Sequence, residues 1–232
     1  TGIAYRGSFR CSDEHLNALY DACIRTQRNN AVGQFVDCPH REQAQYLADT
    51  DLQAELLLYN FDAAAMLDKT LTDFADAQLA DGTFPFVAPT NYDEHSGFHI
   101  QIPEWDLHFA TLLWKIYEHS GDEKLLAKHE GTLGRMLDYF VGLAETHGGL
   151  VPPDKGWHIS DWPYPSVEHA GEHLTVQQIK LVQALRVAES AARWMGKPED
   201  ADRRGAQAEA LTVRMRDALY DRGRRRYRDS SG

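Results

Sequence analysis

Helical segments alternate along this chain with short turns and with much longer aromatic loops, and this alternation limits the possible folds most strongly. Apolar residues recur three and four positions apart in these segments, as in helices with one buried face. Short turns are predicted at 60–62, 119–122 and 196–198, and long loops at 82–102 and 148–172. Helical hairpins therefore repeat at intervals of about sixty to seventy-five residues.

Consecutive antiparallel helices place all the long loops at one end, where they can form one pocket. This is the layout of an (α/α) toroid. We predict seven helices in 232 residues, whereas a closed barrel of six hairpins contains twelve. The fold class is therefore predicted to be all-α, an (α/α)6-barrel type of toroid that is incomplete in this chain. Its open edge would expose apolar helix faces, so we expect the missing remainder of the barrel or an oligomer contact to cover it.

A highly charged segment joins the first two predicted helices: Asp37-Cys38-Pro39-His40-Arg41-Glu42-Gln43-Ala44-Gln45-Tyr46-Leu47-Ala48-Asp49. If the second helix begins near Arg41, Glu42 and Asp49 are seven residues apart and share one face. Asp37 would stand just ahead of that helix, as a cap or pointing into a cleft. Crowded carboxylates repel one another, so one of them can retain a proton and donate it. On spacing alone, an ordinary solvated helix start capped by Asp37 is favoured.

Three tryptophans suggest a carbohydrate ligand, because flat aromatic faces suit the C–H faces of sugars. Trp105 lies at helical spacing with Phe109, so it fits the core at least as well as a binding site. Trp157 and Trp162 lie in the second long loop with Asp161 between them. For this loop the binding interpretation is favoured.

Composition excludes several classes of function. The formal net charge of −11 argues against nucleic acid and anionic membranes as partners. No apolar run approaches the ~20 residues that a membrane-spanning helix needs. The three cysteines form no CxxC pair and the loop histidines lack ligand spacing, so we expect no disulfide framework, no metal and no cofactor. A reducing cytoplasm fits these cysteines, although a signal could lie on an N-terminal part outside this chain.

The charged segment reads DCPxRExAQYLxD and resembles the acidic motif of the bacterial α-L-rhamnosidases of glycoside hydrolase family 78. The lead-in Gly7-Ser8-Phe9-Arg10-Cys11-Ser12-Asp13 and the loop sequence His-Ile-Ser-Asp-Trp-Pro resemble the same family. The resemblance implies that residues 1–10 are an extended linker from a preceding β-domain. It also implies that residues 11–232 are the first half, or slightly more, of the catalytic (α/α)6 barrel.

By position, the resemblance implies that Glu42 is the general acid and that Asp37 and Asp49 bind rhamnose. Arg41 could pair with either aspartate and keep it ionised while Glu42 stays protonated, or it could form a weak surface ion pair. The family inverts configuration, which also requires a basic carboxylate roughly 6.5–9.5 Å from the acid.

No segment here matches the motif that carries the base in the family, so we expect the base to lie beyond Gly232. The loop acids Asp161, Glu94, Glu104 and Glu168 are conceivable substitutes, and nothing singles one out. Three functions remain open. The chain is part of a rhamnosidase acting on a rhamnosylated glycoside or polysaccharide, a non-catalytic sugar-binding or scaffold domain, or another α/α-toroid hydrolase or lyase acting on uronic sugars.

Overall fold

The computed structural model describes residues 3–90, 101–153, 156–158 and 172–229 of the chain. Within these residues the helices are α1 (Glu14–Asn30), α2 (Leu47–Asn60), α3 (Ala64–Asp76), α4 (Pro103–Asp106), α5 (His108–Ser120), α6 (Glu123–Thr146), α7 (Thr175–Trp194) and α8 (Pro198–Leu219). Strands β1 (Tyr220–Asp221) and β2 (Arg226–Tyr227) form one small antiparallel hairpin. The predicted all-α class is confirmed, with the helix that begins at Pro103 divided at Leu107.

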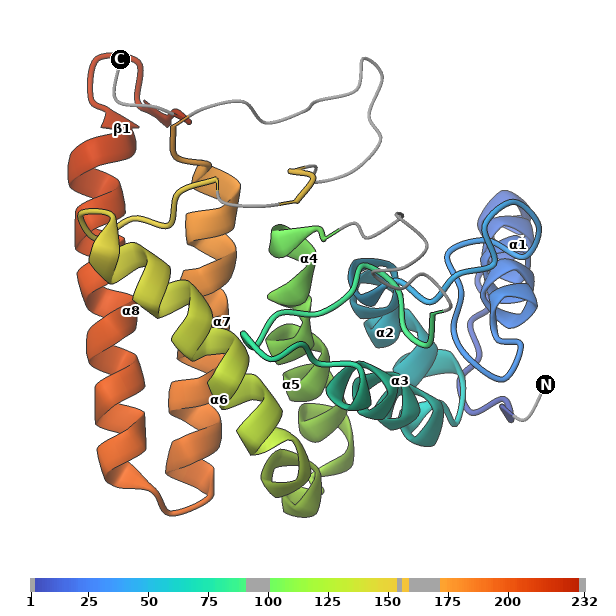
Figure 1. Cartoon of the computed structure of the whole chain (residues 1–232). Coiled ribbons are helices and arrows are strands. Elements are labelled where there is room, and N and C mark those ends of the chain that lie inside the picture. Colours follow the sequence, from blue (N-terminus) through green and yellow to red (C-terminus); the bar gives the residue numbers. More distant parts are fainter. Residues whose placement is uncertain (1–2, 91–100, 154–155, 159–171, 230–232) are drawn as a thin grey trace.

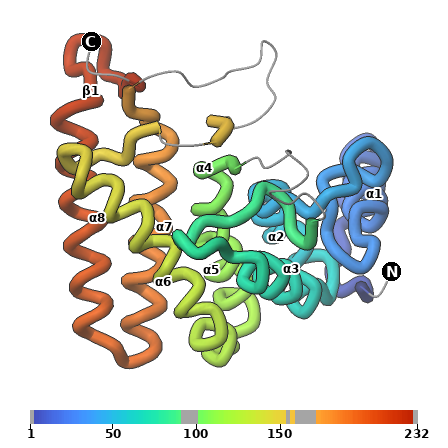
Figure 2. The backbone as a smooth tube through the Cα atoms, in the orientation of Figure 1, coloured from blue at the N-terminus to red at the C-terminus, as the bar shows by residue number. Residues whose placement is uncertain are grey.

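The helices follow one another around an arc from α1 to α8 (Figure 1). Helix α5 packs against α2 on one side and α7 on the other, while α3 and α6 contact each other and also pack against α5. Figure 2 traces the same path and shows the short α5–α6 and α7–α8 connections at the lower edge, opposite the starts of α4 and α7. This arrangement of successive hairpins is consistent with part of an (α/α)6 toroid.

The short turn between α5 and α6 is encoded by two adjacent residues. Gly121 has a φ of 66°, in the left-handed region that favours glycine, and its N–H donates to the Tyr117 carbonyl at 2.7 Å. Asp122 then accepts from the Lys124 N–H at 3.0 Å and caps α6. The chain therefore reverses direction within two residues.

The buried faces of the helices form one hydrophobic core. Its largest fully buried side chains include six phenylalanines, which are Phe35, Phe61, Phe74, Phe84, Phe109 and Phe140. Phe84 stacks on Phe109 with ring centroids 5.2 Å apart, which joins the loop after α3 to α5. None of the helices among the described residues is both long enough and apolar enough to cross a membrane.

The second helix begins at Leu47 and not near Arg41 as predicted. Residues 39–42 form a turn, and Gln43 has a φ of 52°, which a right-handed helix cannot contain. Tyr46 is the N-cap residue and makes no side-chain cap bond. The interpretation that Glu42 and Asp49 share a helix face is therefore wrong, and Asp37 does not cap this helix.

Several large apolar side chains are exposed on α2, as an open edge would require. Leu52, Leu56 and Tyr59 follow one another along one line of the helix and have exposed fractions of 63%, 52% and 60%. Three large apolar side chains on one exposed helix face are unusual for a free surface. That another part of the barrel or an oligomer contact covers them stays a prediction.

Two histidine–aspartate pairs, each with a buried histidine, join neighbouring helices. His108 Nδ1 on α5 lies 2.6 Å from Asp51 Oδ2 on α2, and His129 Nε2 on α6 lies 2.8 Å from Asp68 Oδ1 on α3. Burial lowers the pKa of both histidines and outweighs the opposing effect of their aspartates. Burial alone would raise the pKa of each aspartate, but hydrogen bonds and charges from its histidine and a lysine lower it.

The fold should lose stability as the pH falls from about 7 to 5. The unfolded chain takes up protons at the ordinary histidine pKa of about 6.5, whereas the folded chain resists protonation of His108 and His129 until lower pH. The stability from these lowered pKa values is therefore complete above about pH 6.5 and lost below it. Denaturant unfolding across this range measures the slope. His129→Gln should flatten the slope and the exposed His119→Gln should not, and an equal effect of the two would contradict the argument.

Candidate active site

The segment between α1 and α2 is a closed loop that carries Glu42. The Asp37 N–H donates to the Ala44 carbonyl at 3.0 Å, and the Ala44 N–H donates back to Asp37 Oδ1 at 3.1 Å. Asn30, the last residue of α1, donates from Nδ2 to the Asp37 carbonyl at 3.1 Å. Asp37 and Ala44 thus close the base of an excursion formed by residues 38–43, which we call the acid loop.

Glu42 lies on the acid loop with its side chain 37% exposed. Its Oε2 accepts a hydrogen bond from the Tyr46 hydroxyl at 2.5 Å, and its backbone N–H points to Cys38 Sγ at 3.4 Å. The Nε atom of Arg41 is 4.0 Å from Glu42 Oε1, but this arginine side chain is 87% exposed and contributes little in water. Arg41 forms no ion pair with Asp37 among the described residues, contrary to one predicted pairing.

Tyr46 connects Glu42 to the aromatic wall beside it. Its ring meets Trp105 edge-on with centroids 5.3 Å apart, and lies 6.0 Å from Phe86. Burial raises the pKa of Tyr46 above its ordinary value, and its hydrogen bond to Glu42 and the negative charges of Glu42, Asp37 and Asp49 raise it further. The hydroxyl therefore keeps its proton and acts as a donor to Glu42. The three predicted carboxylates do gather around this one phenol.

Gln45 holds the acid loop against the rest of the molecule, and sequence reasoning missed it. Its side chain is fully buried and all four of its hydrogen-bonding positions are used. Nε2 donates to Asp73 Oδ2 at 2.8 Å and to the Ala88 carbonyl at 2.7 Å. Oε1 accepts from the Thr70 hydroxyl at 2.9 Å and from the Phe35 N–H at 3.3 Å. Nothing in the sequence distinguishes this glutamine from a solvated one.

The described parts of the long loops lie at the same end as the acid loop, as predicted. The Ala88 N–H donates to the Gln45 carbonyl at 3.3 Å, so the loop after α3 contacts the start of α2. The Trp157 N–H donates to the Gln101 carbonyl at 2.7 Å, so the loop after α6 contacts the residues that precede α4. The structure therefore brings the loop after α3 against the start of α2, next to Tyr46, and the loop after α6 against the start of α4, next to Trp105.

The remaining predicted site residues lie in different parts of the structure. Trp105 is half-buried and packs on Tyr46, so it belongs to the wall near Glu42 and not to the central core. Trp157 is half-buried in the loop after α6, and Asp49 lies in the first turn of α2. Asp161 and Trp162, together with the loop acids Glu94 and Glu168, lie outside the described residues.

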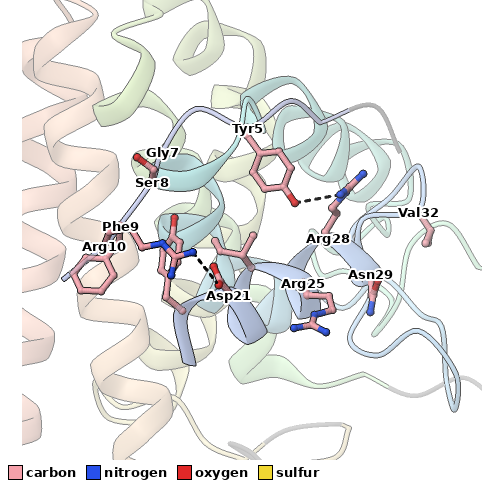
Figure 3. Close-up of a pocket in the computed structure, with 12 residues that line it drawn as sticks. Tyr5, Gly7, Ser8, Phe9, Arg10, Asp21, Arg25, Arg28, Asn29 and Val32 are labelled. Atoms are coloured by element: carbon pink, nitrogen blue, oxygen red, sulfur yellow. Dashed lines mark hydrogen bonds and ion pairs between the residues drawn. The ribbon is translucent and has the colours of Figure 1, made fainter. Parts of the chain in front are cut away.

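A separate hollow of about 780 Å³ lies between the N-terminal segment and α1 (Figure 3). Arg28 donates to the Tyr5 hydroxyl at 3.2 Å across one side of it, and Arg10 lies 3.7 Å from Asp21 on the other. None of the predicted site residues lines this hollow. Within the described ranges, no group of three or more histidines, cysteines and acids is placed to hold a metal ion.

Comparison with known proteins identifies the family. Residues 4–232 match the model of the bacterial alpha-L-rhamnosidase six-hairpin glycosidase domain, and the chain belongs to this family. An alpha-L-rhamnosidase of Streptomyces avermitilis is 29% identical over 163 residues, and one of Formosa agariphila is 24% identical over 177 residues. Each comparison covers 70% of this chain, but only 15% and 18% of the respective relative.

Solved structures give the same result for the fold. The chain superposes on a family 78 rhamnosidase of Bacillus sp. GL1 with a TM-score of 0.87 and 27% identity, covering 98% of this chain and 23% of the other. An alpha-L-rhamnosidase of Streptomyces avermitilis in complex with L-rhamnose gives a TM-score of 0.80 at 24% identity, covering 96% and 20%. A rhamnosidase of Klebsiella oxytoca with rhamnose bound gives 0.78 at 23% identity, covering 98% and 44%. The chain therefore spans less than half of each of these proteins.

Replacing Gln45 by leucine should lower the free energy of unfolding by at least about 2 kcal/mol, because buried donors and acceptors from three segments lose their partner. Urea unfolding of the wild-type and variant chains measures the difference. Gln53→Leu on α2 is the matched control, since this side chain makes no comparable contacts among the described residues. A Gln45 variant as stable as the control would show that these hydrogen bonds are replaceable by apolar contact.

Proposed function

We propose that the complete protein containing this chain is an α-L-rhamnosidase that releases terminal α-L-rhamnose from a glycoside or polysaccharide. The observation that carries this proposal is the placement of Glu42. An exposed carboxylate is held at 2.5 Å by the Tyr46 hydroxyl, beside Trp105 and at the end where the long loops meet. Membership of the six-hairpin glycosidase domain family supports the reaction class, and the rhamnosidases with bound rhamnose support the sugar.

In this proposal Glu42 is the general acid that protonates the leaving glycosidic oxygen. Its exposure leaves it accessible to a substrate, and the donated hydrogen bond from Tyr46 fixes which oxygen faces the site. Asp37 and Asp49 accept hydrogen bonds from sugar hydroxyls. Asp37 uses Oδ1 to hold the Ala44 N–H, which leaves Oδ2 for the substrate.

The other sugar-binding residues in the proposal are Arg41, Trp105 on α4, and Trp157, Asp161 and Trp162 from the loop segment after α6. Trp105 presents an aromatic wall directly beside the phenol that holds Glu42. Arg41 is largely exposed, so it would contribute only when a substrate covers it.

The proposed reaction inverts the configuration of the sugar. It requires a carboxylate base across the ring from Glu42, roughly 6.5–9.5 Å from the acid, to activate water. We propose that this base lies outside residues 1–232. The same remaining part of the barrel is proposed to cover the apolar line of Leu52, Leu56 and Tyr59 on α2.

Glu42→Gln in the complete protein should reduce hydrolysis of natural rhamnosides by about 10²–10⁴-fold, because the leaving oxygen loses its proton donor. An aryl rhamnoside with an activated leaving group should lose less, since its leaving group needs little protonation. Steady-state kinetics on both substrates measure the two effects, with the exposed Glu118→Gln as the control. Equal losses on both substrates would assign Glu42 a structural role.

Residues 1–232 alone should show no measurable rhamnosidase activity and should bind rhamnose weakly. General acid catalysis without a base leaves the water unactivated, and a partial site does not enclose the sugar ring. The measurement is an aryl-rhamnoside assay, with Glu42→Gln as the control for a contaminating enzyme. Turnover that disappears in this control would place a base within residues 1–232, and Asp161 would be examined first.

A further inference from the structure

Two buried side chains next to Trp105 leave polar atoms without partners. Glu104 Oε1 lies 2.8 Å from His158 Nδ1, and the two side chains are only 2% and 10% exposed. The other carboxylate oxygen, Glu104 Oε2, and the other ring nitrogen, His158 Nε2, are buried and have no hydrogen-bond partner among the residues that the structure describes. Trp105 Nε1, on the adjacent residue, is likewise buried and unpartnered.

Two other histidine–carboxylate pairs within the described residues differ from this one in their charged neighbours. Asp51 contacts Thr111 and Lys115 as well as His108, and Asp68 accepts from Lys128 as well as His129. In each of those pairs a lysine reaches the carboxylate, although Asp51 Oδ1 is also buried without a hydrogen-bond partner among the described residues, whereas Glu104 forms no such lysine contact within them. A buried polar atom without a partner lowers stability, so it is usually explained by water or by a ligand.

The Glu104–His158 pair is joined to the acid loop by short contacts. Glu104 and Trp105 are consecutive residues of α4, and the Trp105 ring meets Tyr46, whose hydroxyl holds Glu42. On the other side, the hydrogen bond from the Trp157 N–H to the Gln101 carbonyl holds His158 against the start of α4. The unpartnered atoms therefore lie on and directly behind Trp105, the residue that packs on Tyr46 beside Glu42.

The chemistry of these atoms selects a ligand rich in hydroxyl groups. When His158 Nδ1 donates its proton to Glu104, the singly protonated ring presents Nε2 as an acceptor. Glu104 Oε2 is a second acceptor, and the indole N–H of Trp105 is a donor. A sugar hydroxyl both donates and accepts, so a neutral sugar can satisfy all three atoms, whereas the Glu104 carboxylate would repel an anionic ligand.

We propose that Glu104 and His158, with the Trp105 N–H, form a subsite that binds sugar hydroxyls and positions the ring against Glu42. This inference rests on the proposed function and assigns Glu104 to substrate binding instead of to base catalysis. The pair is 54 positions apart in the chain, and it connects the loop after α6 to the helix that carries Trp105.

Two substitutions at His158 in the complete protein separate ligand binding from a structural role. Asparagine can place its amide near Nδ1 and keep the contact with Glu104, but has no atom at Nε2. Glutamine can place its amide near Nε2, but loses the contact at Nδ1. If Nε2 binds the sugar, His158→Asn should raise KM and the Kd of L-rhamnose by about 10-fold, and His158→Gln should restore most of the affinity.

Isothermal titration with L-rhamnose gives the Kd, steady-state kinetics separate KM from kcat, and thermal unfolding verifies the fold. His147→Asn, a change at an exposed histidine beyond α6, is the matched control. If His158→Asn keeps the wild-type KM and Kd, the inference is overturned. A pair that has only a structural role, or that binds only water, would leave both constants unchanged. If that variant does not fold, Trp105→Phe removes the indole N–H, keeps an aromatic ring beside Tyr46, and is judged by the same measurements.

The same measurements distinguish a failure of the subsite inference from a failure of the proposed function. A wild-type protein that neither hydrolyses rhamnosides nor binds rhamnose would overturn that function. The subsite is then tested by titrating other neutral monosaccharides. Affinity for any of them that is lost in His158→Asn and retained in His158→Gln supports the subsite, and the absence of binding to all of them overturns it.

Discussion

The geometry of the candidate site depends on the buried carboxamide of Gln45. A glutamine side chain offers two donors and two acceptor positions, and all four are matched by partners from the loop after α1, from α3 and from the loop after it. A buried amide with only some of its hydrogen bonds would destabilise the fold. The arrangement of these segments that is favoured is therefore the one in which every donor and acceptor of the Gln45 side chain has a partner. That arrangement fixes where the chain leaves the acid loop and enters α2, and hence where Tyr46 and Glu42 lie.

From this backbone position, Tyr46 orients the carboxylate of Glu42. Its ring is held by Trp105 and Phe86, and its hydroxyl keeps its proton because burial and three nearby carboxylates raise its pKa. Because the phenol keeps its proton, it favours the orientation of Glu42 in which a carboxylate oxygen accepts its hydrogen bond. The same residue, Tyr46, therefore contacts both the aromatic wall and the acid. A substrate that displaced Trp105 would change the position of the Tyr46 hydroxyl and hence of Glu42.

The sequence predicted the parts of the fold that depend on local chemistry. Helical periodicity located the hairpins, and the pair Gly121-Asp122 marked a turn whose backbone conformation and cap both lie within two residues. The start of α2 was predicted wrongly because the left-handed Gln43 and the burial of Gln45 are set by tertiary contacts. The Glu104–His158 pair was also missed, since no pattern in the chain relates residues 54 positions apart.

Helix α2 links the candidate site to the exposed apolar line formed by three of its own side chains. It follows directly on its N-cap residue Tyr46, packs against α3 and α5, and exposes Leu52, Leu56 and Tyr59 along another face. Whatever covers this apolar line also restrains how the helix can tilt and rotate on its packed face. Because Tyr46 is the first residue outside α2, such motion would move its hydroxyl relative to Trp105. If the proposed remainder of the barrel covers this line, its closure would act on the orientation of Glu42 through this one helix.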